Sequence, residues 1–228
     1  MNVPDPSFPL AAADDLFAAD PPGLPTRESP LPGVLLLRGF LLAEASPLLA
    51  ALRAVVVAAP FRAMTTKGGR RMSVASTSCG DYGWVSGDAG YGYASRDPLR
   101  DQPWPAIPPL LRQLAQQAAQ EAGFAGFEPD TCLINRYRPG AKMSLHQDKD
   151  ERDVTQPVVS FSLGLPARFL FGGFERGGRP LRLPLFHGDV LVWGGPARLR
   201  FHGVLPVEEG HHPRLGPQRI NLTFRRAR

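Results

Sequence analysis

The stretch Arg219-Ile-Asn-Leu-Thr-Phe-Arg225 alternates strictly between polar and apolar side chains. Successive side chains of a β-strand point to opposite faces, so this alternation predicts a strand with one apolar face that packs into the body of the protein. The other face would carry Arg219, Asn221, Thr223 and Arg225. Two arginines and an amide in line suit an anion, because a guanidinium binds a carboxylate through two hydrogen bonds and keeps its charge when partly buried.

Further short strands are expected upstream, from Thr131 onward. They are separated by Pro-Gly, Gly-Gly and Gly-Asp turns. Many short strands without helices between them are typical of a β-sandwich or a jelly roll. The expected strands are Cys132–Tyr137, Val158–Leu163, Phe169–Phe171, Arg182–Leu185, Val190–Trp193, Leu199–Gly203 and Arg219–Phe224.

Two helices are predicted in the N-terminal half. The first begins at Ser46-Pro47, where a capping residue precedes a proline, and Pro60 stops it. The second covers about Pro109–Ala122. With an early strand at Val34–Leu37, the fold class is mainly β with some α: a jelly roll whose two flanking helices cover one outer face of the β body.

Residues 62–104 have a different character, with glycines, aromatic residues and basic residues such as Arg70 and Arg71 interspersed. The long apolar periodicity of a core element is missing. The stretch is therefore predicted to form loops and short hairpins, which often carry binding functions. Residues 1–30, rich in Pro, Ala and Asp, are predicted to be a partly flexible arm, and residues 31–228 a single domain.

A chain of 228 residues, 43% of them apolar, suits one domain with a sizeable core. Its formal net charge of +5 is mild support for an anionic partner such as nucleic acid. Cys79 and Cys132 belong to no zinc-like cluster, which favours structural thiols in a reducing compartment. No apolar run approaches the ~20 residues that cross a membrane, and the basic start of a secretory signal is missing. We expect a cytoplasmic monomer without membrane contact.

Residues 145–150 read Leu-His-Gln-Asp-Lys-Asp. On an extended strand, His146 and Asp148 would project to the same side. One imidazole and one carboxylate suit a divalent first-row metal such as iron(II), and a second histidine would complete a facial triad with open positions for a co-substrate and oxygen. The His-x-Asp pair alone is weak support, because such a short motif often arises by chance.

The second imidazole could come from any of the other histidines. His202 has β-like neighbours and lies far enough after Asp148 for several strands to return to the site. His211 and His212 lie in a loop rich in Gly and Pro and are expected to be solvated. His187 precedes a Gly-Asp turn and is expected to be structural. His202 is therefore the favoured third ligand.

A second alternating strand would place Asn135 and Tyr137 on one face. A small dicarboxylate held between this face and the strand at 219–225 could chelate a metal at one end and meet an arginine at the other. The alternative is that Arg219 and Arg225 lie on an exposed sheet face, as charged residues usually do. The metal motif favours the dicarboxylate.

Taken together, these motifs resemble the AlkB family of DNA-repair dioxygenases. The resemblance covers about residues 34–226 and leaves only the N-terminal arm outside. The matching segments are Cys132-Leu-Ile-Asn-Arg-Tyr137, Pro139-Gly-Ala-Lys142, Ser144-Leu-His-Gln-Asp-Lys-Asp150, Ser162-Leu-Gly-Leu-Pro166, His187-Gly-Asp-Val190, Val192-Trp-Gly-Gly195 and Asn221-Leu-Thr-Phe-Arg225.

The resemblance implies a double-stranded β-helix core with Fe(II) as the metal and 2-oxoglutarate and O2 as co-substrates. The implied iron ligands are His146, Asp148 and His202. The implied 2-oxoglutarate contacts are Asn135, Tyr137, Arg219, Asn221 and Arg225. The family oxidises N-alkyl groups on bases such as 1-methyladenine and 3-methylcytosine, so the expected products are the restored base, formaldehyde, succinate and CO2.

The resemblance further implies that a base leaves the stack to reach the buried metal. Trp84 would stack on one face of this base and the His146 ring on the other, since cationic methylated bases favour aromatic faces; the alternative is that Trp84 anchors a loop. Asp150 would meet the exocyclic amine. The other implied contacts are Thr66, Tyr91, Tyr93 and Arg176, with Arg70, Arg71 and Lys149 along the strand path. Residues 62–104 would then form a nucleotide-recognition lid.

Three functions remain open. The leading prediction is a demethylase of alkylated DNA, single-stranded by the resemblance, with RNA as an open alternative. A dioxygenase of the same core that acts on a protein or small metabolite would not need the basic stretch at 62–104. A metal-free binder of damaged DNA would not need the metal triad. Iron-dependent succinate release separates the binder from the two enzymes, and formaldehyde release from a methylated oligonucleotide separates the enzymes from each other.

Overall fold

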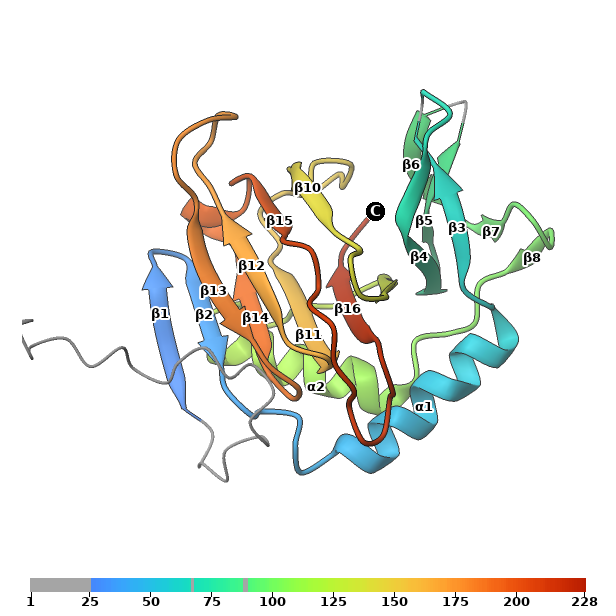
Figure 1. Ribbon diagram of the computed structural model, residues 1–228, viewed down its shortest axis with the longest axis horizontal. Coiled ribbons are helices and arrows are strands. Elements are labelled where there is room, and N and C mark those ends of the chain that lie inside the picture. The colour runs from blue at the N-terminus through green and yellow to red at the C-terminus, as the bar shows by residue number, and fades with distance from the viewer. Residues whose placement is uncertain (1–25, 67, 88–89) are drawn as a thin grey trace, which may run out of the picture.

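The computed structural model describes residues 26–66, 68–87 and 90–228 (Figure 1). Most of the expected arm, residues 1–25, lies outside the described residues. In chain order the elements are β1 (Arg27–Leu31), β2 (Val34–Leu37), α1 (Ala45–Ala58), β3 (Arg62–Thr65), β4 (Arg71–Gly80), β5 (Gly83–Gly87), β6 (Gly90–Ala94), β7 (Arg96–Asp97), β8 (Gln102–Pro103), α2 (Pro109–Glu121), β9 (Thr131–Tyr137), β10 (Met143–His146), β11 (Val158–Gly164), β12 (Ala167–Phe171), β13 (Leu181–Leu185), β14 (Val190–Trp193), a short 3-10 helix (Gly195–Ala197), β15 (His202–Val204) and β16 (Arg219–Arg225).

Two antiparallel sheets form the body of the molecule (Figure 1). The larger sheet has the strand order β1-β2-β14-β11-β16-β9-β4-β3, and the smaller has the order β10-β15-β12-β13. The chain crosses repeatedly between the two sheets, as it does in a jelly roll. The mainly β fold with a double-stranded β-helix core is therefore confirmed.

Two apolar cores lie on opposite faces of the larger sheet. Leu36 of β2 belongs to the same core as Trp193 and residues of the smaller sheet, whereas its neighbours Leu35 and Leu37 pack with α1 and α2. The helices therefore cover the outer face, as predicted (Figure 1). The three apolar residues of β16 also belong to the helix-side core. The polar face of β16 consequently points between the two sheets.

Several element boundaries differ from the predictions by one to three residues, among them those of α1 and β15. Helix α1 begins at Ala45 with Glu44 as its N-cap and without a side-chain cap, so Ser46 lies inside the first turn. The strand expected at Leu199–Gly203 is shorter and begins at His202. It is preceded by Arg198, which caps the short 3-10 helix in a helical conformation and whose buried guanidinium donates to backbone carbonyls.

The prediction for residues 62–104 was wrong for one segment. Strand β4 joins the larger sheet and pairs with β9 from Ala75 to Gly80. Its buried residues are largely small and polar, and two of their hydroxyls bond to other segments: Ser76 Oγ donates to Asn135 Oδ1 of β9, and Thr77 Oγ1 donates to the Ala59 carbonyl at the end of α1. Hydroxyl side chains hide the apolar periodicity by which a buried strand is recognised.

The rest of this stretch includes the hairpin β5–β6, which forms its own two-stranded sheet. In Figure 1 it rises beside the open end of the two main sheets, close to β4. Neither helix in the described part of the chain has the length and apolar character needed to cross a membrane.

Candidate functional site

Two neighbouring strands of the smaller sheet bring two histidines together. His146 ends β10, His202 begins β15, and they are direct partners in the antiparallel register, with ring centroids 4.4 Å apart. The Asp148 carboxylate lies 3.7 Å from Nε2 of each ring. One ligand atom from each of the three residues lies within 4.8 Å of the others. The structure thus assembles a facial triad of two imidazoles and one carboxylate.

Backbone carbonyls orient both rings for metal binding. Nδ1 of His146 lies 2.9 Å from the Ser144 carbonyl, and Nδ1 of His202 lies 3.1 Å from the Arg200 carbonyl. A carbonyl only accepts, so each Nδ1 carries the proton and each Nε2 presents a lone pair. Burial, together with the nearby His146, lowers the pKa of His202 to about 4, which keeps the ring neutral. A neutral imidazole is the form that binds a metal.

The third ligand, Asp148, is kept ionised by a neighbouring arginine. Burial alone would raise the pKa of Asp148, but the Arg225 guanidinium beside it holds that pKa well below its usual range. Arg225 donates from Nε to Asp148 Oδ2 over 2.8 Å, and its Nη2 lies 2.6 Å from the same oxygen. Asp148 is therefore ionised and ready to bind a cation.

The remaining histidines do not join the triad. His187 is buried, and its Nδ1 accepts a hydrogen bond from the Gly164 backbone N–H, so it is structural as predicted. His211 is exposed, as expected. The expectation for His212 was wrong: its ring packs against His187 at 4.3 Å, and its Nδ1 accepts backbone N–H groups of the loop.

The expected anion-binding residues share one buried face between the sheets. In the β9–β16 register, Asn135 lies opposite Asn221 and Tyr137 opposite Arg219. All seven residues of β16 are buried, so the alternative of an exposed arginine face was wrong. Burial raises the pKa of Tyr137 to about 12, which leaves its phenol neutral and able to donate a hydrogen bond.

The buried arginines of this face retain unused hydrogen-bonding capacity. Arg219 is 1% exposed, and only Nη2 has a protein partner, the Ser162 hydroxyl at 3.1 Å. Its Nε and Nη1, and Nη1 of Arg225, have no partner within the described residues. Buried charged donors without acceptors are costly and usually indicate a ligand. The free donors on Arg219 and Arg225 fit an anionic molecule such as a dicarboxylate.

The hairpin β5–β6 contributes aromatic side chains next to the triad. The Trp84 indole N–H donates to Asp150 over 3.1 Å, and the Trp84 ring stacks on Tyr91 with centroids 5.7 Å apart. The Tyr93 hydroxyl donates to Glu151 over 2.6 Å. Asp150 and Glu151 follow the ligand Asp148 by two and three residues, so these contacts bring the hairpin to the metal site.

The other expected substrate contacts lie in two separate loops. Thr66 is in the turn between β3 and β4, where its hydroxyl accepts the backbone N–H of Arg70. Arg176 lies in the loop between β12 and β13, with its guanidinium 5.6 Å from the Phe201 ring centroid. Arg71 and Lys149 are exposed. The structure therefore brings together Trp84, Tyr91, Tyr93 and Asp150, but not Thr66 or Arg176.

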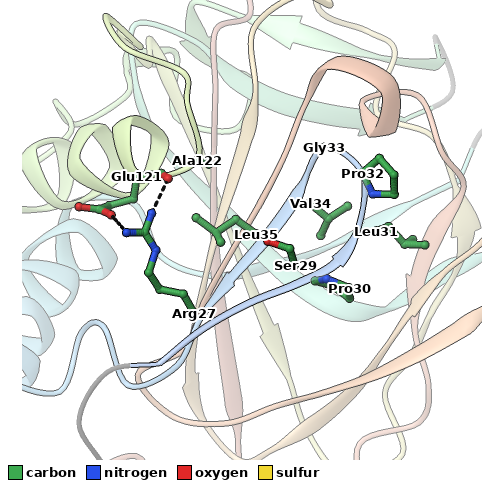
Figure 2. Close-up of a pocket in the computed structure, with 10 residues that line it drawn as sticks. All are labelled: Arg27, Ser29, Pro30, Leu31, Pro32, Gly33, Val34, Leu35, Glu121 and Ala122. Atoms are coloured by element: carbon green, nitrogen blue, oxygen red, sulfur yellow. Dashed lines mark hydrogen bonds and ion pairs between the residues drawn. The ribbon is translucent and has the colours of Figure 1, made fainter.

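A cavity of about 620 Å³ lies elsewhere, between the β1–β2 hairpin and the end of α2 (Figure 2). Figure 2 shows Arg27 reaching across it to the Glu121 carboxylate, an ion pair of 2.8 Å, and to the Glu121 backbone carbonyl. None of the triad residues lines this cavity, and its charged groups already pair with each other. The chemistry therefore lies at the triad and not in this cavity.

Comparison with known proteins agrees with this geometry. The model of the 2OG-Fe(II) oxygenase superfamily matches residues 33–225. The chain is 52% identical to the alpha-ketoglutarate-dependent dioxygenase AlkB of Salmonella typhimurium and 50% identical to that of Escherichia coli, covering 93% of this chain and 97% of each relative. The chain belongs to the AlkB family of iron(II)- and 2-oxoglutarate-dependent dioxygenases. A solved structure titled "The structure of OsALKBH1" also superposes, with a TM-score of 0.77 and 29% identity over 88% of this chain and all of that chain.

As an AlkB-family enzyme, the protein uses Fe(II) as its cofactor and 2-oxoglutarate and O2 as co-substrates. Its residues fit both groups. Two imidazoles and a carboxylate are a donor set that iron(II) accepts while other positions stay open. The unpartnered guanidinium donors of Arg219 suit the carboxylate of 2-oxoglutarate.

Sequence reasoning on this AlkB-family chain missed a set of buried polar residues around the site. Glu151 and Arg198 form a buried ion pair of 3.0 Å, and Arg198 Nη1 also donates to the Asp148 carbonyl over 2.6 Å. Ser160 and Ser162 accept hydrogen bonds from Asn221 and Arg219. The alternation of the serines in Val-Val-Ser-Phe-Ser could have indicated their role, whereas no local pattern indicates Arg198.

Proposed function

We propose that this enzyme repairs nucleic acid by removing N-linked alkyl groups from bases such as 1-methyladenine and 3-methylcytosine. DNA, as a single strand, is the proposed substrate. The iron with 2-oxoglutarate and O2 supplies the oxidation that hydroxylates the alkyl carbon, giving succinate and CO2. The resulting hemiaminal loses formaldehyde and leaves the restored base.

The proposed residue roles follow the geometry. His146, Asp148 and His202 hold the iron, and Arg225 keeps Asp148 ionised. The proposed 2-oxoglutarate contacts are Asn135, Tyr137, Arg219, Asn221 and Arg225. Their donors are fixed in neighbouring strands before the co-substrate arrives, which lowers the entropic cost of binding it.

One observation carries the choice of a base over a metabolite or a protein side chain: the hydrogen bond between Trp84 and Asp150 beside the metal ligand Asp148. This pair presents an aromatic plane and a carboxylate at one point. A methylated base of this class is a flat cation with an exocyclic amine, so it suits both groups. Tyr93, whose hydroxyl donates to Glu151, would lie on the same side of the base as this pair. Thr66, Tyr91 and Arg176 are proposed to contact the nucleic-acid strand.

We also propose that the protein is located in the cytoplasm and is a monomer. Cys79 and Cys132 are buried register partners on neighbouring strands, and as structural thiols they would suit a reducing compartment. The residues 62–104 serve as the recognition lid in this proposal, with β4 fixing its base in the larger sheet.

The test is a panel of methylated oligonucleotides. The protein is incubated without oxygen with iron(II), 2-oxoglutarate and a DNA or RNA strand that carries 1-methyladenine or 3-methylcytosine, oxygen is added, and the strand is weighed by mass spectrometry. We expect the mass of one methylene to be lost from the methylated strand. Succinate formation with unchanged mass across the whole panel would contradict the proposal.

A further inference from the structure

The loop between β12 and β13 carries an exposed aromatic ring. Phe174 is 56% exposed, and the other exposed aromatic side chain of the described residues is Tyr91, at 52%. Tyr91 belongs to the β5–β6 hairpin. In Figure 1 the hairpin and the β12–β13 loop rise on the same side of the molecule, with β10 between them. His146 ends β10, so the two segments that carry exposed aromatic residues lie on either side of the strand that bears this metal ligand.

One face of the Phe174 ring is covered by an arginine. The Arg200 guanidinium carbon lies 4.9 Å from the ring centroid, and Nη1 of Arg200 donates to the Gly172 carbonyl over 2.9 Å. This hydrogen bond fixes the guanidinium against the ring. The exposed area of Phe174 therefore lies mainly on the opposite face and the ring edge, where a second flat group could stack.

The loop is attached to the segment that bears a metal ligand. The Gly172 N–H donates to the Phe201 carbonyl over 2.6 Å, and the Phe201 N–H donates to the Gly173 carbonyl over 2.9 Å. Arg200 and Phe201 directly precede His202. The position of Phe174 is thereby coupled to the metal site, as a binding subsite for the same substrate requires.

The charge around Phe174 suits a polyanion. The loop and the start of β13 carry Arg176, Arg179 and Arg182 against the single acidic residue Glu175, and Arg200 adds a further positive charge. Arginine next to an exposed aromatic ring is the combination with which proteins bind single strands: the cation meets the phosphate and the ring stacks on a base.

We propose that Phe174, backed by Arg200, is a stacking platform for an unpaired base of the substrate strand next to the methylated nucleotide. This inference rests on the proposed function, because only a polynucleotide offers such a neighbouring base. It differs from the Trp84–Asp150 pair, which takes the methylated base itself. Every base has an aromatic face, so the platform adds affinity without sequence preference.

The test compares two substrates of different length. KM and kcat are measured with a methylated single-stranded pentanucleotide and with the matching methylated mononucleotide, for the wild type and for Phe174→Ala, Phe174→Leu and Phe174→Trp. Val57→Ala, an exposed apolar residue of α1, is the control. Affinity for an unmethylated pentanucleotide is measured by fluorescence anisotropy in parallel.

Loss of a base–aromatic stack should raise KM for the pentanucleotide about fivefold or more in the Ala and Leu variants, and weaken binding of the unmethylated strand similarly. KM for the mononucleotide and both kcat values should stay unchanged, and the Trp variant should bind like the wild type. An unchanged pentanucleotide KM in Phe174→Ala would overturn the platform. If Phe174→Leu behaves like the wild type, Phe174 is only an apolar contact and not a stacking platform. If the KM values of both substrates change equally, Phe174 has a structural role and the platform is also overturned.

The failure of the proposed function would look different. A wild-type protein that releases formaldehyde from neither substrate would contradict the demethylase. Binding of the unmethylated pentanucleotide would still decide the platform, because that measurement needs no turnover.

Discussion

Strand β16 and the hairpin β5–β6 both contribute side chains to the site, but they are held in different ways. Every residue of β16 is buried, and the strand pairs with β9 on one side and β11 on the other. The hairpin pairs only with itself, and most of its residues are half-buried. Side chains tie it to the body through the bonds of Trp84 to Asp150 and Tyr93 to Glu151.

This difference separates the chemistry from substrate choice. The side chains that bind the metal and the co-substrate are held in place by strand pairing, and this pairing does not depend on which substrate is bound. Two of the bonds that hold the hairpin, Trp84 to Asp150 and Tyr93 to Glu151, are made by the same aromatic and acidic groups that would meet the base. Changes around the triad and β16 should therefore remove turnover or co-substrate binding, whereas changes in the hairpin should weaken substrate binding and leave the oxidation intact.

The largest effect is expected for Asp148→Ala, which removes a metal ligand and leaves the buried Arg225 without its main partner. We expect no measurable succinate or formaldehyde and a loss of stability of about 3 kcal/mol, the lower end of the usual cost of breaking a buried ion pair, because Glu151 still lies 3.5 Å from Nε of Arg225. Turnover assays and urea unfolding measure both. Asp81→Ala, at an exposed carboxylate, is the control; full activity in Asp148→Ala would remove the ligand assignment.

Arg219→Lys tests the co-substrate side of the comparison. Lysine keeps the charge but loses the planar fork, so KM for 2-oxoglutarate should rise about tenfold or more, as for a lost charge-assisted hydrogen bond. KM for the methylated oligonucleotide should not change. Arg226→Lys, at an exposed residue that directly follows the same strand, should match the wild type. An unchanged 2-oxoglutarate KM in Arg219→Lys would place the co-substrate elsewhere.

Trp84→Ala tests the hairpin side. Loss of stacking should weaken binding of methylated strands by ~1–3 kcal/mol, while the KM for 2-oxoglutarate stays the same. Trp84→Phe keeps a ring but loses the hydrogen bond to Asp150, so it should show a smaller loss. If titration calorimetry gives equal affinities for the wild type and Trp84→Ala, the tryptophan only anchors the hairpin.

The smallest effect is expected for Gly83→Ala. An added Cβ would lie 2.2 Å from the ring of the buried Trp104, so the base of the hairpin must shift. KM for the oligonucleotide should rise about threefold, a cost of less than 1 kcal/mol, with unchanged 2-oxoglutarate affinity. Gly87→Ala, in the same strand with open space around it, is the matched control. Equal KM values for both variants would show that the hairpin position does not affect substrate binding.

The same contrast explains what the sequence could predict of the fold. Strand β16 was predicted because its apolar residues alternate, and α2 because it begins at a proline and ends before a glycine. Strand β4 was missed because the residues it buries include Ser76 and Thr77, whose hydroxyl groups are satisfied only by partners on other segments. Such tertiary hydrogen bonds leave no periodic signal in the chain itself.

The site divides in a similar way. The triad was predictable because His146 and Asp148 lie two residues apart on one strand end and histidine is rare in this chain. The buried pair of Glu151 and Arg198 was not, because it joins two loops that only the folded sheets bring together. Tyr93 was expected to contact the substrate. In the structure its hydroxyl donates to Glu151, the acidic member of that same pair.

The most direct test of the account is the ratio of formaldehyde to succinate in one reaction with a single-stranded oligonucleotide that carries 1-methyladenine. The wild type should release the two products in equal amounts, and Asp148→Ala should release neither. Succinate formed by the wild type in the presence of the methylated strand, without formaldehyde, would contradict the assignment of an alkylated base as the substrate of this iron site.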